Sequence, residues 1–371
     1  MFFVLGGEKM DKLNESRKQI EQIDKEMAKL FCQRLDAAKE IASYKKERAL
    51  PVYDALRESE LIKANLSYVE KGEHAEFYEL FIKDVMKNSR LYQDRIINGL
   101  KVVYCGEKGA FAHIASQKAF PNANYYACLD FETAYKGVEN GEYDCAVLPL
   151  ENSFAGEVGV VSDLMFSGSL YINRVVEVGV VHNLLGVKGA KMLDIKTVVS
   201  HPQALEQCAD FIKQKNLKTV EYSNTALAAK FVSEKNDPTI CAIASSETAE
   251  EYGLEILEGG INTSSNNTTR FGVFTRVSNL PNPSSKNENE HFILMFTTKN
   301  EAGALAQALN IIGAHNFNMR SLRSRPLKDL LWNYYFYVEL EGNVASRDGK
   351  EMLQELSAIC ARLKLVGTYT K

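Results

Sequence analysis

The sequence predicts a multidomain protein with an all-α segment, an α/β segment and a small α+β segment. Residues 1–98 repeat apolar side chains at steps of three and four, with no Gly or Pro from Glu8 until Pro51. From Lys101 short apolar runs alternate with helix-like stretches, which is typical of α/β structure. A polar linker rich in Pro, Ser and Asn at 279–290 precedes a β-α-β-β-α-β pattern, the ferredoxin-like split arrangement. We therefore expect domains at 1–98, 101–279 and 290–371.

Composition excludes several classes of protein. The 371 residues carry a net charge of −4, which gives no indication of a nucleic-acid or membrane-surface partner. The 7 cysteines are scattered without a CxxC pair, as expected of reduced thiols in a cytoplasmic protein without a metal site. No apolar stretch has the length of a signal core or a membrane span. The GxxG pattern at Gly106–Gly109 favours a plain turn, so no cofactor is expected.

The first predicted helix carries cations on its apolar stripe. Steps of three and four from Leu13 reach Arg17, Arg34 and Lys45 at positions where apolar residues would stabilise helix packing better. Cations that face a packed core are costly unless an anion meets them there. The stripe therefore indicates an anion-binding site inside a helical bundle. Snorkelling side chains or interhelical ion pairs, with Asp24 as one partner, are the alternative.

The spacing of these cations limits how they can act together. At about 1.5 Å of rise per residue, Arg34 lies roughly 16 Å from Lys45, and Arg17 roughly 25 Å from Arg34. Arg34 and Lys45 could flank one elongated small molecule, whereas Arg17 of the same helix could not join them. If all three serve one ligand, Arg17 comes from a second, antiparallel chain. We therefore expect a homodimer or a tetramer with a site shared between chains.

Two more predicted helices add polar groups. The second opens at Pro51–Glu58 and runs to about Tyr68, and the third runs from about Ala75 to Asn98. Ser89 and Gln93 are four residues apart and so share a face. The three helices together supply one dense set of donors and acceptors: Arg34, Lys45, Asp54, Arg57, Glu58, Ser89 and Gln93.

This set resembles the all-helical chorismate mutase family, and the resemblance covers nearly all of the first hundred residues. It implies the pericyclic rearrangement of chorismate to prephenate, which needs a bound compact conformer and charge near the ether oxygen. By this resemblance, Arg17 from the partner chain, Arg34 and Arg57 hold carboxylates. Lys45 and Gln93 face the ether oxygen, and Asp54, Glu58 and Ser89 orient the helix ends and the hydroxyl.

The α/β segment has polar clusters near its predicted strands. The strands expected are Val102–Cys105, Cys145–Pro149, Tyr171–Gly179, Thr197–Ser200, Thr219–Tyr222, Cys241–Ala244 and Phe271–Val277. Clusters at Pro149–Ser153 and Ser200–Gln207 follow strands, where ligands of open α/β sheets bind, and a third at Asn266–Phe271 precedes its strand. Each cluster alone is also typical of a turn or helix cap. Together they suit polarising hydroxyls and donating a proton rather than nucleophilic attack.

Three runs in this segment resemble prephenate dehydratase over roughly residues 101–277. They are Leu-Glu-Asn-Ser at 150–153, Ser-His-Pro-Gln at 200–203 and Thr-Arg-Phe at 269–271. The resemblance implies two α/β lobes, like a type II periplasmic binding protein, with prephenate in the cleft between them. It implies that Thr269 donates a proton to the departing hydroxyl, that Asn152, Ser200 and Gln207 position substrate, and that Arg270 holds a carboxylate. Glu107, Ala110 and Ala112 depart from the family pattern in the glycine loop.

The last segment resembles an ACT domain, a small amino-acid sensor. Its recognisable parts are Gly303-Ala304-Leu305 and Ser324-Arg325-Pro326, and the resemblance implies phenylalanine as the effector. Arg323 replaces the family's usual Glu, and Ala306 its usual Val; a dimerisation module without a ligand is the alternative. The three resemblances together imply a bifunctional chorismate mutase–prephenate dehydratase that makes phenylpyruvate. A mutase with a degenerate dehydratase and a non-catalytic small-molecule receptor remain alternatives.

Overall fold

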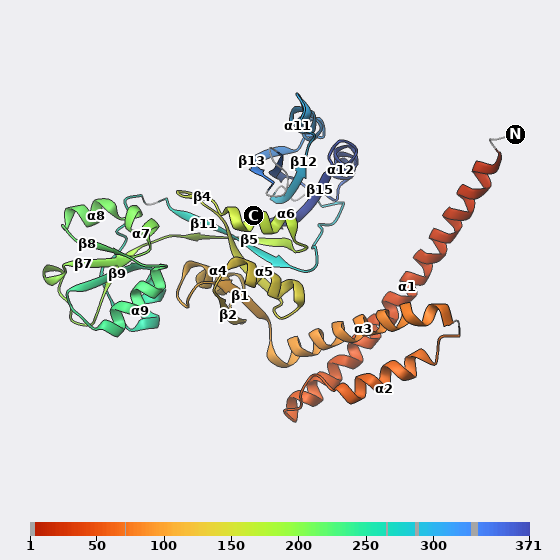
Figure 1. The fold of residues 1–371 in the computed structure, drawn as a ribbon, viewed down its shortest axis with the longest axis horizontal. Coiled ribbons are helices and arrows are strands. Elements are labelled where there is room, and N and C mark those ends of the chain that lie inside the picture. The colour runs from red at the N-terminus through yellow and green to blue at the C-terminus, as the bar shows by residue number, and fades with distance from the viewer. Residues whose placement is uncertain (1–3, 71, 265, 286–288, 328–332) are drawn as a thin grey trace. The chain divides into compact units, whose positions relative to one another are not determined.

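The computed structural model describes residues 4–70, 72–264, 266–285, 289–327 and 333–371, with side chains described from residue 12 onward (Figure 1). The chain forms two compact units, Met1–Leu100 and Lys101–Lys371. The predicted division of the second unit at residues 279–290 stays a prediction, since the segments on either side share one sheet.

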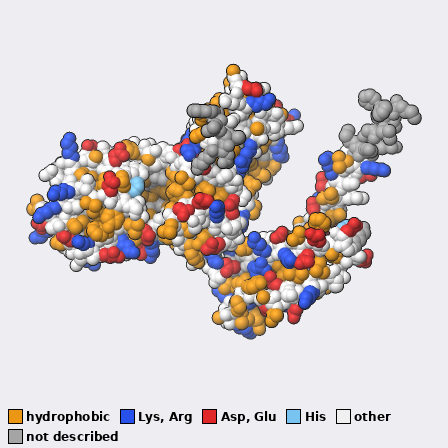
Figure 2. Space-filling view, in the orientation of Figure 1, with side chains coloured by type: hydrophobic (Ala, Val, Ile, Leu, Met, Phe, Trp, Pro, Cys, Tyr) orange, Lys and Arg blue, Asp and Glu red, His pale blue; other side chains and the backbone are white. Residues whose placement is uncertain are grey.

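The first unit is all-helical, as predicted. It consists of α1 (Val4–Glu47), α2 (Ala55–Leu66) and α3 (Gly72–Asn98). Small residues of α1, Ala38 and Ala42, are buried with Ile82 and Met86 of α3, so the two helices pack closely. The N-terminal half of α1 instead exposes its apolar stripe: Leu13, Ile20, Ile23, Met27 and Leu30. In the space-filling view apolar side chains are visible among charged ones on the surface of this unit (Figure 2).

The second unit begins with an α/β lobe. Its strands are β1 (Lys101–Cys105), β2 (Asn124–Cys128), β3 (Cys145–Asn152), β4 (Gly156–Glu157), β5 (Tyr171–Gly179) and β11 (Thr268–Thr275). Its helices are α4 (Phe111–Ala119), α5 (Phe131–Asn140) and α6 (Gly159–Ser167). β1 pairs in parallel with β2 and β3, while β11 runs antiparallel between β3 and β5. Tyr135, Leu148 and Phe274 are fully buried in its core.

A second α/β lobe is inserted between β5 and β11 (green in Figure 1). Its sheet has the order β10-β6-β9-β7-β8, built from β6 (Asn183–Gly186), β7 (Thr197–Ser200), β8 (Lys218–Glu221), β9 (Ile240–Ala244) and β10 (Glu255–Glu258). The remaining elements are η1 (Met192–Asp194), α7 (Pro202–Gln207), α8 (Ala209–Gln214), α9 (Thr225–Lys235) and α10 (Ser246–Tyr252). The two-lobed arrangement is confirmed.

A buried contact joins the lobes at the glycine loop. The carbonyl of Gly109 accepts hydrogen bonds from the hydroxyls of Ser245 at 3.0 Å and Thr248 at 2.9 Å. Gly109 has a φ of +86°, and a Cβ there would lie 3.0 Å from the Cα of Thr248. Glycine is therefore required both by the backbone conformation and by the close approach of the second lobe.

The C-terminal segment has the predicted order of elements. It comprises β12 (Glu290–Thr297), α11 (Ala304–Ala314), β13 (Asn318–Pro326), β14 (Tyr334–Glu341), α12 (Arg347–Ile359) and β15 (Arg362–Thr370). The strand order β13-β14-β12-β15 is that of the split β-α-β arrangement. β15 continues the first lobe's sheet by pairing with β5 at Gly367 and Ile172. A Cβ at Gly367 would lie 1.9 Å from the Ile172 carbonyl oxygen, so this junction requires glycine.

Some strand predictions were incomplete. β2, β4, β6 and β10 were not predicted; β4 has only two residues, and β2 and β10 carry few buried side chains. One placement was wrong: β11 begins at Thr268, so Thr269 and Arg270 lie within the strand instead of before it. Neighbouring residues of a strand face opposite sides of the sheet, so this correction separates the two side chains.

Candidate active sites

The helical unit contains a pocket of about 440 Å³. All of the polar residues that the sequence placed together line it: Arg34, Lys45, Asp54, Arg57, Glu58, Ser89 and Gln93. Ala38, Ile41, Leu61 and Met86 provide apolar walls. The pocket thus combines a hydrophobic surface with cations, as a site for a small organic anion requires.

Hydrogen bonds hold several of these side chains in place. Arg34 donates to the Ser89 hydroxyl, and burial lowers the pKa of Arg34. The Lys45 ammonium donates to the Val52 carbonyl at 2.6 Å, which ties the end of α1 to the segment before α2. Asp54 caps α2 by accepting from the Arg57 amide at 3.0 Å. Gln93 is buried, and its amide oxygen has no partner among the described residues, so the side chain is available to a ligand.

Sequence reasoning missed Arg90. This residue of α3 lines the pocket and pairs with both carboxylate oxygens of Glu58 on α2. Its place in the pocket could have been predicted from the sequence, because Arg90 lies four residues after Met86 and three before Gln93, on the same helix face. Arg90 adds a further cation to the pocket and fixes the carboxylate of Glu58.

Arg17 does not line this pocket. It is exposed on the N-terminal half of α1, as the distance along one helix predicted. The pocket therefore contains the cations of one chain, and the contribution of Arg17 from a partner chain stays a prediction.

A larger cavity of about 690 Å³ is lined by residues of both lobes of the second unit. Thr269 of β11, Asn152 of β3 and Gln207 of α7 line it, as the sequence predicted. Among the other lining residues are Gly106, Ala110, Phe111, His182, His201 and Asn224. Ala110 and Ala112, which line the cavity, have no hydroxyl to offer a ligand.

Asn152 determines the orientation of the Thr269 hydroxyl. The two residues are register partners on adjacent strands, and the Asn152 amide nitrogen donates to the Thr269 Oγ1 at 2.9 Å. The amide oxygen of Asn152 is fixed because it accepts from the backbone N–H groups of Phe154 and Ala155, both at 2.9 Å. Since the Thr269 oxygen accepts this bond, its own proton is free to be donated toward the cavity.

Gln207 is held by a histidine that the sequence did not single out. The His182 Nε2 lies 2.8 Å from the Gln207 Oε1, and the imidazole packs edge-on to Phe111. Burial lowers the pKa of His182 more than the Gln207 hydrogen bond raises it, so the ring is neutral near pH 7. No sequence motif surrounds His182, so geometry alone identifies it.

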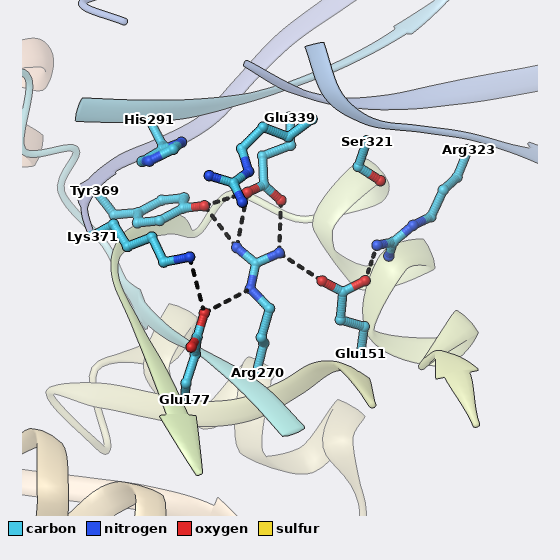
Figure 3. Close-up of a pocket in the computed structure, with 10 residues that line it drawn as sticks. Glu151, Glu177, Arg270, His291, Ser321, Arg323, Glu339, Tyr369 and Lys371 are labelled. Carbon is cyan, nitrogen blue, oxygen red and sulfur yellow. Dashed lines mark hydrogen bonds and ion pairs between the residues drawn. The ribbon is translucent and has the colours of Figure 1, made fainter. Parts of the chain in front are cut away.

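Two residues predicted to contact substrate in the cleft do not line it. Ser200 is fully buried, and its hydroxyl donates to the Ile243 carbonyl at 2.6 Å, which ties β7 to β9. Arg270 lies on the opposite face of β11 from Thr269, in a separate cavity with Glu151 and Glu339 (Figure 3). The predicted roles of Ser200 and Arg270 are therefore corrected.

The predicted effector residues lie at one edge of the C-terminal sheet. Gly303, with a φ of 85°, precedes α11, which contains Ala304 and Leu305. Ser324, Arg325 and Pro326 end β13. Both Thr297 of β12 and Arg325 of β13 pair with Tyr335 of β14, so the two segments emerge at the same end of the sheet. Arg325 also pairs with Asp163 of α6 at 3.1 Å, whereas Ser324 is exposed.

Known proteins match both units. A prephenate dehydratase family model matches residues 102–279, and a type II chorismate mutase model matches residues 16–94. A bifunctional chorismate mutase/prephenate dehydratase of Buchnera aphidicola is 31% identical over 369 residues, covering 95% of each chain. A prephenate dehydratase of Arthrobacter aurescens, solved in complex with L-Phe, is 26% identical with a TM-score of 0.68, covering 73% of this chain and 90% of its own. A quorum-quenching acylase, GqqA, is 30% identical with a TM-score of 0.67, covering 73% of this chain and 97% of its own.

These matches and the two pockets define an enzyme with a helical mutase domain and an α/β dehydratase domain. The chain belongs to the family of bifunctional chorismate mutase/prephenate dehydratases of aromatic amino acid biosynthesis. Within the described residues, no helix is long and apolar enough to cross a membrane, and no group of three His, Cys, Asp or Glu side chains is placed to hold a metal ion.

Proposed function

We propose that the chain converts chorismate to prephenate in the helical pocket and prephenate to phenylpyruvate in the cleft between the α/β lobes. The observation that supports this most directly is that each enzyme segment encloses its own pocket. In the cleft, the Asn152–Thr269 pair supplies an oriented proton donor.

The helical pocket suits a reaction that needs no covalent intermediate. Chorismate is a dianion, and Arg34 and Arg57 supply cations for its carboxylates. As the ether bond breaks, negative charge develops on its oxygen, and Lys45 and Gln93 stabilise that charge. Because Lys45 is held by the Val52 carbonyl before the reaction, its charge favours the transition state over the flexible substrate.

The mutase site is completed by Arg17 of the partner subunit. The exposed apolar stripe around Leu13, Ile20 and Met27 supports this, since a second antiparallel helix would bury it. Mixing Arg17→Ala and Arg34→Ala chains, each inactive alone, should restore partial mutase activity in heterodimers. Failure to recover activity despite confirmed subunit exchange would contradict a shared site.

The cleft suits a decarboxylative dehydration driven by formation of an aromatic ring. Thr269 donates its proton to the hydroxyl of prephenate, which leaves as water while the ring carboxylate leaves as carbon dioxide. The electron pair of the broken C–C bond completes the aromatic ring, and Thr269 recovers a proton from solvent. The protein supplies the acid and the orientation, and Gln207 and His182 line the cleft from the other lobe.

Phenylalanine inhibits the dehydratase through the C-terminal segment, which we assign as an ACT domain. The structural relative from Arthrobacter aurescens was solved with L-Phe, and here the segments at 303–305 and 324–326 emerge at the same sheet edge. Titration calorimetry should show phenylalanine binding that weakens in a Ser324→Phe variant, since a bulky side chain would fill the exposed site. Undetectable binding to the wild-type chain would contradict this role.

Both activities are tested by supplying each substrate separately. Chorismate should be consumed with an absorbance decrease, and prephenate should yield phenylpyruvate. Turnover of neither substrate would contradict the proposed function. Accumulation of prephenate from chorismate, unchanged by Thr269→Ala, would indicate a mutase with a degenerate dehydratase.

A further inference from the structure

The paired strands β3 and β11 carry two adjacent cross-strand pairs that face opposite sides of the sheet. Thr269 is paired with Asn152 and lines the cleft. The next pair, Arg270 with Glu151, lines a polar cavity of about 290 Å³ against the C-terminal sheet. Any shift of the second pair therefore moves the first pair, because the same two backbone segments carry both.

The terminal nitrogens of Arg270 are engaged in this cavity, while its Nε lies 4.0 Å from Glu177 (Figure 3). Its Nη1 donates to Glu151 at 2.6 Å and to Glu339 of β14 at 2.9 Å, and its Nη2 donates to Glu339 at 2.9 Å and to the Tyr369 hydroxyl at 2.7 Å. All four N–H groups of the terminal nitrogens are used, which leaves none for a substrate. The geometry is instead that of a bidentate clamp on Glu339.

Glu339 depends on this clamp. Its side chain is 2% exposed. Burial raises the pKa of Glu339, but hydrogen bonds from Arg270 and Tyr369 outweigh it and hold the pKa below its usual value. For Arg270, burial lowers the pKa, but hydrogen bonding to Glu339 outweighs it and raises the pKa overall. Both side chains therefore stay charged; removing Arg270 leaves the buried Glu339 carboxylate without its ion-pair partner, whereas removing Glu339 leaves Arg270 paired with Glu151 alone at hydrogen-bond distance.

Glu151 is held from a second direction. Its other carboxylate oxygen accepts from Arg323 of β13, so the carboxylate bridges β11 and the C-terminal sheet. The positive charge of Arg323 is what allows this bridge. Glu151 directly precedes Asn152, the residue that orients the Thr269 hydroxyl.

We propose that Arg270 is a positioning residue for the dehydration: held by Glu339 of the C-terminal sheet, it fixes Glu151 and thereby the Asn152–Thr269 pair on the other face. This rests on the proposed function of the cleft, in which Thr269 is the proton donor. Arg270 does not touch substrate. Arg270 acts on the Thr269 proton donor indirectly, through strands β3 and β11.

The test is the kinetics of Glu339→Gln, which removes the charge that holds Arg270 without changing any residue that lines the cleft. Misplacing a catalytic group by about 1 Å costs up to about a hundredfold in rate, so we expect kcat for prephenate to fall about ten- to a hundredfold. KM should stay within about threefold, because the substrate contacts remain. Rates are normalised to the folded fraction measured by near-ultraviolet circular dichroism, and the mutase activity of the same chain serves as an internal control.

Two further variants separate positioning from general effects. Arg270→Lys keeps the positive charge but loses the bidentate fork, so it should show the same loss of kcat and decides the question if Glu339→Gln folds poorly. Arg320→Ala is the matched control: Arg320 lines the same cavity but pairs with Glu341 at the surface, and its kcat should stay within about twofold.

The outcomes are distinct. A fall in kcat at constant KM supports the positioning role. Unchanged kcat in folded Glu339→Gln and Arg270→Lys, or a loss confined to KM, overturns it. A wild-type chain that does not dehydrate prephenate instead contradicts the proposed function itself.

Discussion

Asn152→Asp is an isosteric change that should reverse one hydrogen bond in the cleft. In the wild-type chain, the amide nitrogen of Asn152 donates to Thr269 at 2.9 Å, so the Thr269 proton points elsewhere. An ionised carboxylate at position 152 can only accept, so the Thr269 hydroxyl would donate to it. The proton needed for the departing hydroxyl of prephenate would then be committed to the wrong partner.

The expected changes in stability and in kcat follow from the hydrogen bonds that Asn152→Asp keeps and those that it loses. The oxygen that accepts from Phe154 and Ala155 is present in both residues. Asn267 now accepts from Asn152 at 2.7 Å, and its own amide nitrogen is buried without a partner among the described residues. A half-turn of the Asn267 side-chain amide lets it donate to the new carboxylate, but the Thr268 carbonyl, which accepts from Asn152 at 3.4 Å, would then face a carboxylate oxygen. Stability should therefore fall by about 1–3 kcal/mol. Proton donation is worth about 10²–10⁴ in rate, and kcat should fall by that factor.

The assay is phenylpyruvate formation from prephenate across pH, with chorismate consumption by the same chain as the control. Below the pKa of a carboxyl at position 152, about 4 in an ordinary aspartate, the protonated group can again donate to Thr269. Activity relative to wild type should therefore recover as the pH falls. A kcat within about threefold of wild type at neutral pH would refute the assigned orientation of Thr269.

Three other changes give separate tests. Arg90→Ala removes a cation from the helical pocket and should lower mutase kcat/KM about tenfold without altering dehydration; an unchanged value would exclude a role for Arg90. Gly109→Ala should destabilise the second unit by about 1–3 kcal/mol, because its Cβ would meet Thr248 at 3.0 Å. Gly189→Ala, also at positive φ but in open space, should cost less, and equal melting temperatures for the two variants would argue against the contact between lobes. The pKa of Glu339 in the folded chain is below its ordinary value of 4.5, so its ionised form adds stability that is lost as the pH falls below about 4.5. The free energy of unfolding of Glu339→Gln should therefore decline less steeply with falling pH than that of the wild-type chain. Parallel plots of unfolding free energy against pH would contradict the buried ion pair.

The mutase pocket was predictable in detail because helical periodicity determines which side chains share a face. Arg34 and Lys45 on α1, and Ser89 and Gln93 on α3, line the same pocket, as their spacing indicated. The same rule would have placed Arg90 there. The contribution of Arg17 depends on a second chain, so the fold of one chain leaves it a prediction.

The cleft was harder to predict because strand boundaries decide which face each side chain takes. Placing the start of β11 after Arg270 hid the fact that Thr269 and Arg270 point in opposite directions. Ser200 was misassigned for a different reason: the bounds of β7 were predicted correctly, but the Ser200 hydroxyl donates to the Ile243 carbonyl of the neighbouring strand β9. Ion pairs between residues far apart in the sequence could not be predicted either: Glu339 lies 69 residues from Arg270.

The central claim, that one chain carries two separable activities, is tested most directly by following chorismate through matched variants. The wild-type chain should produce phenylpyruvate from chorismate, and Thr269→Ala should stop at prephenate. Lys45→Ala should leave chorismate unconsumed while still converting added prephenate at the wild-type rate. Wild-type phenylpyruvate formation by Thr269→Ala, or loss of both activities in each folded variant, would contradict the account.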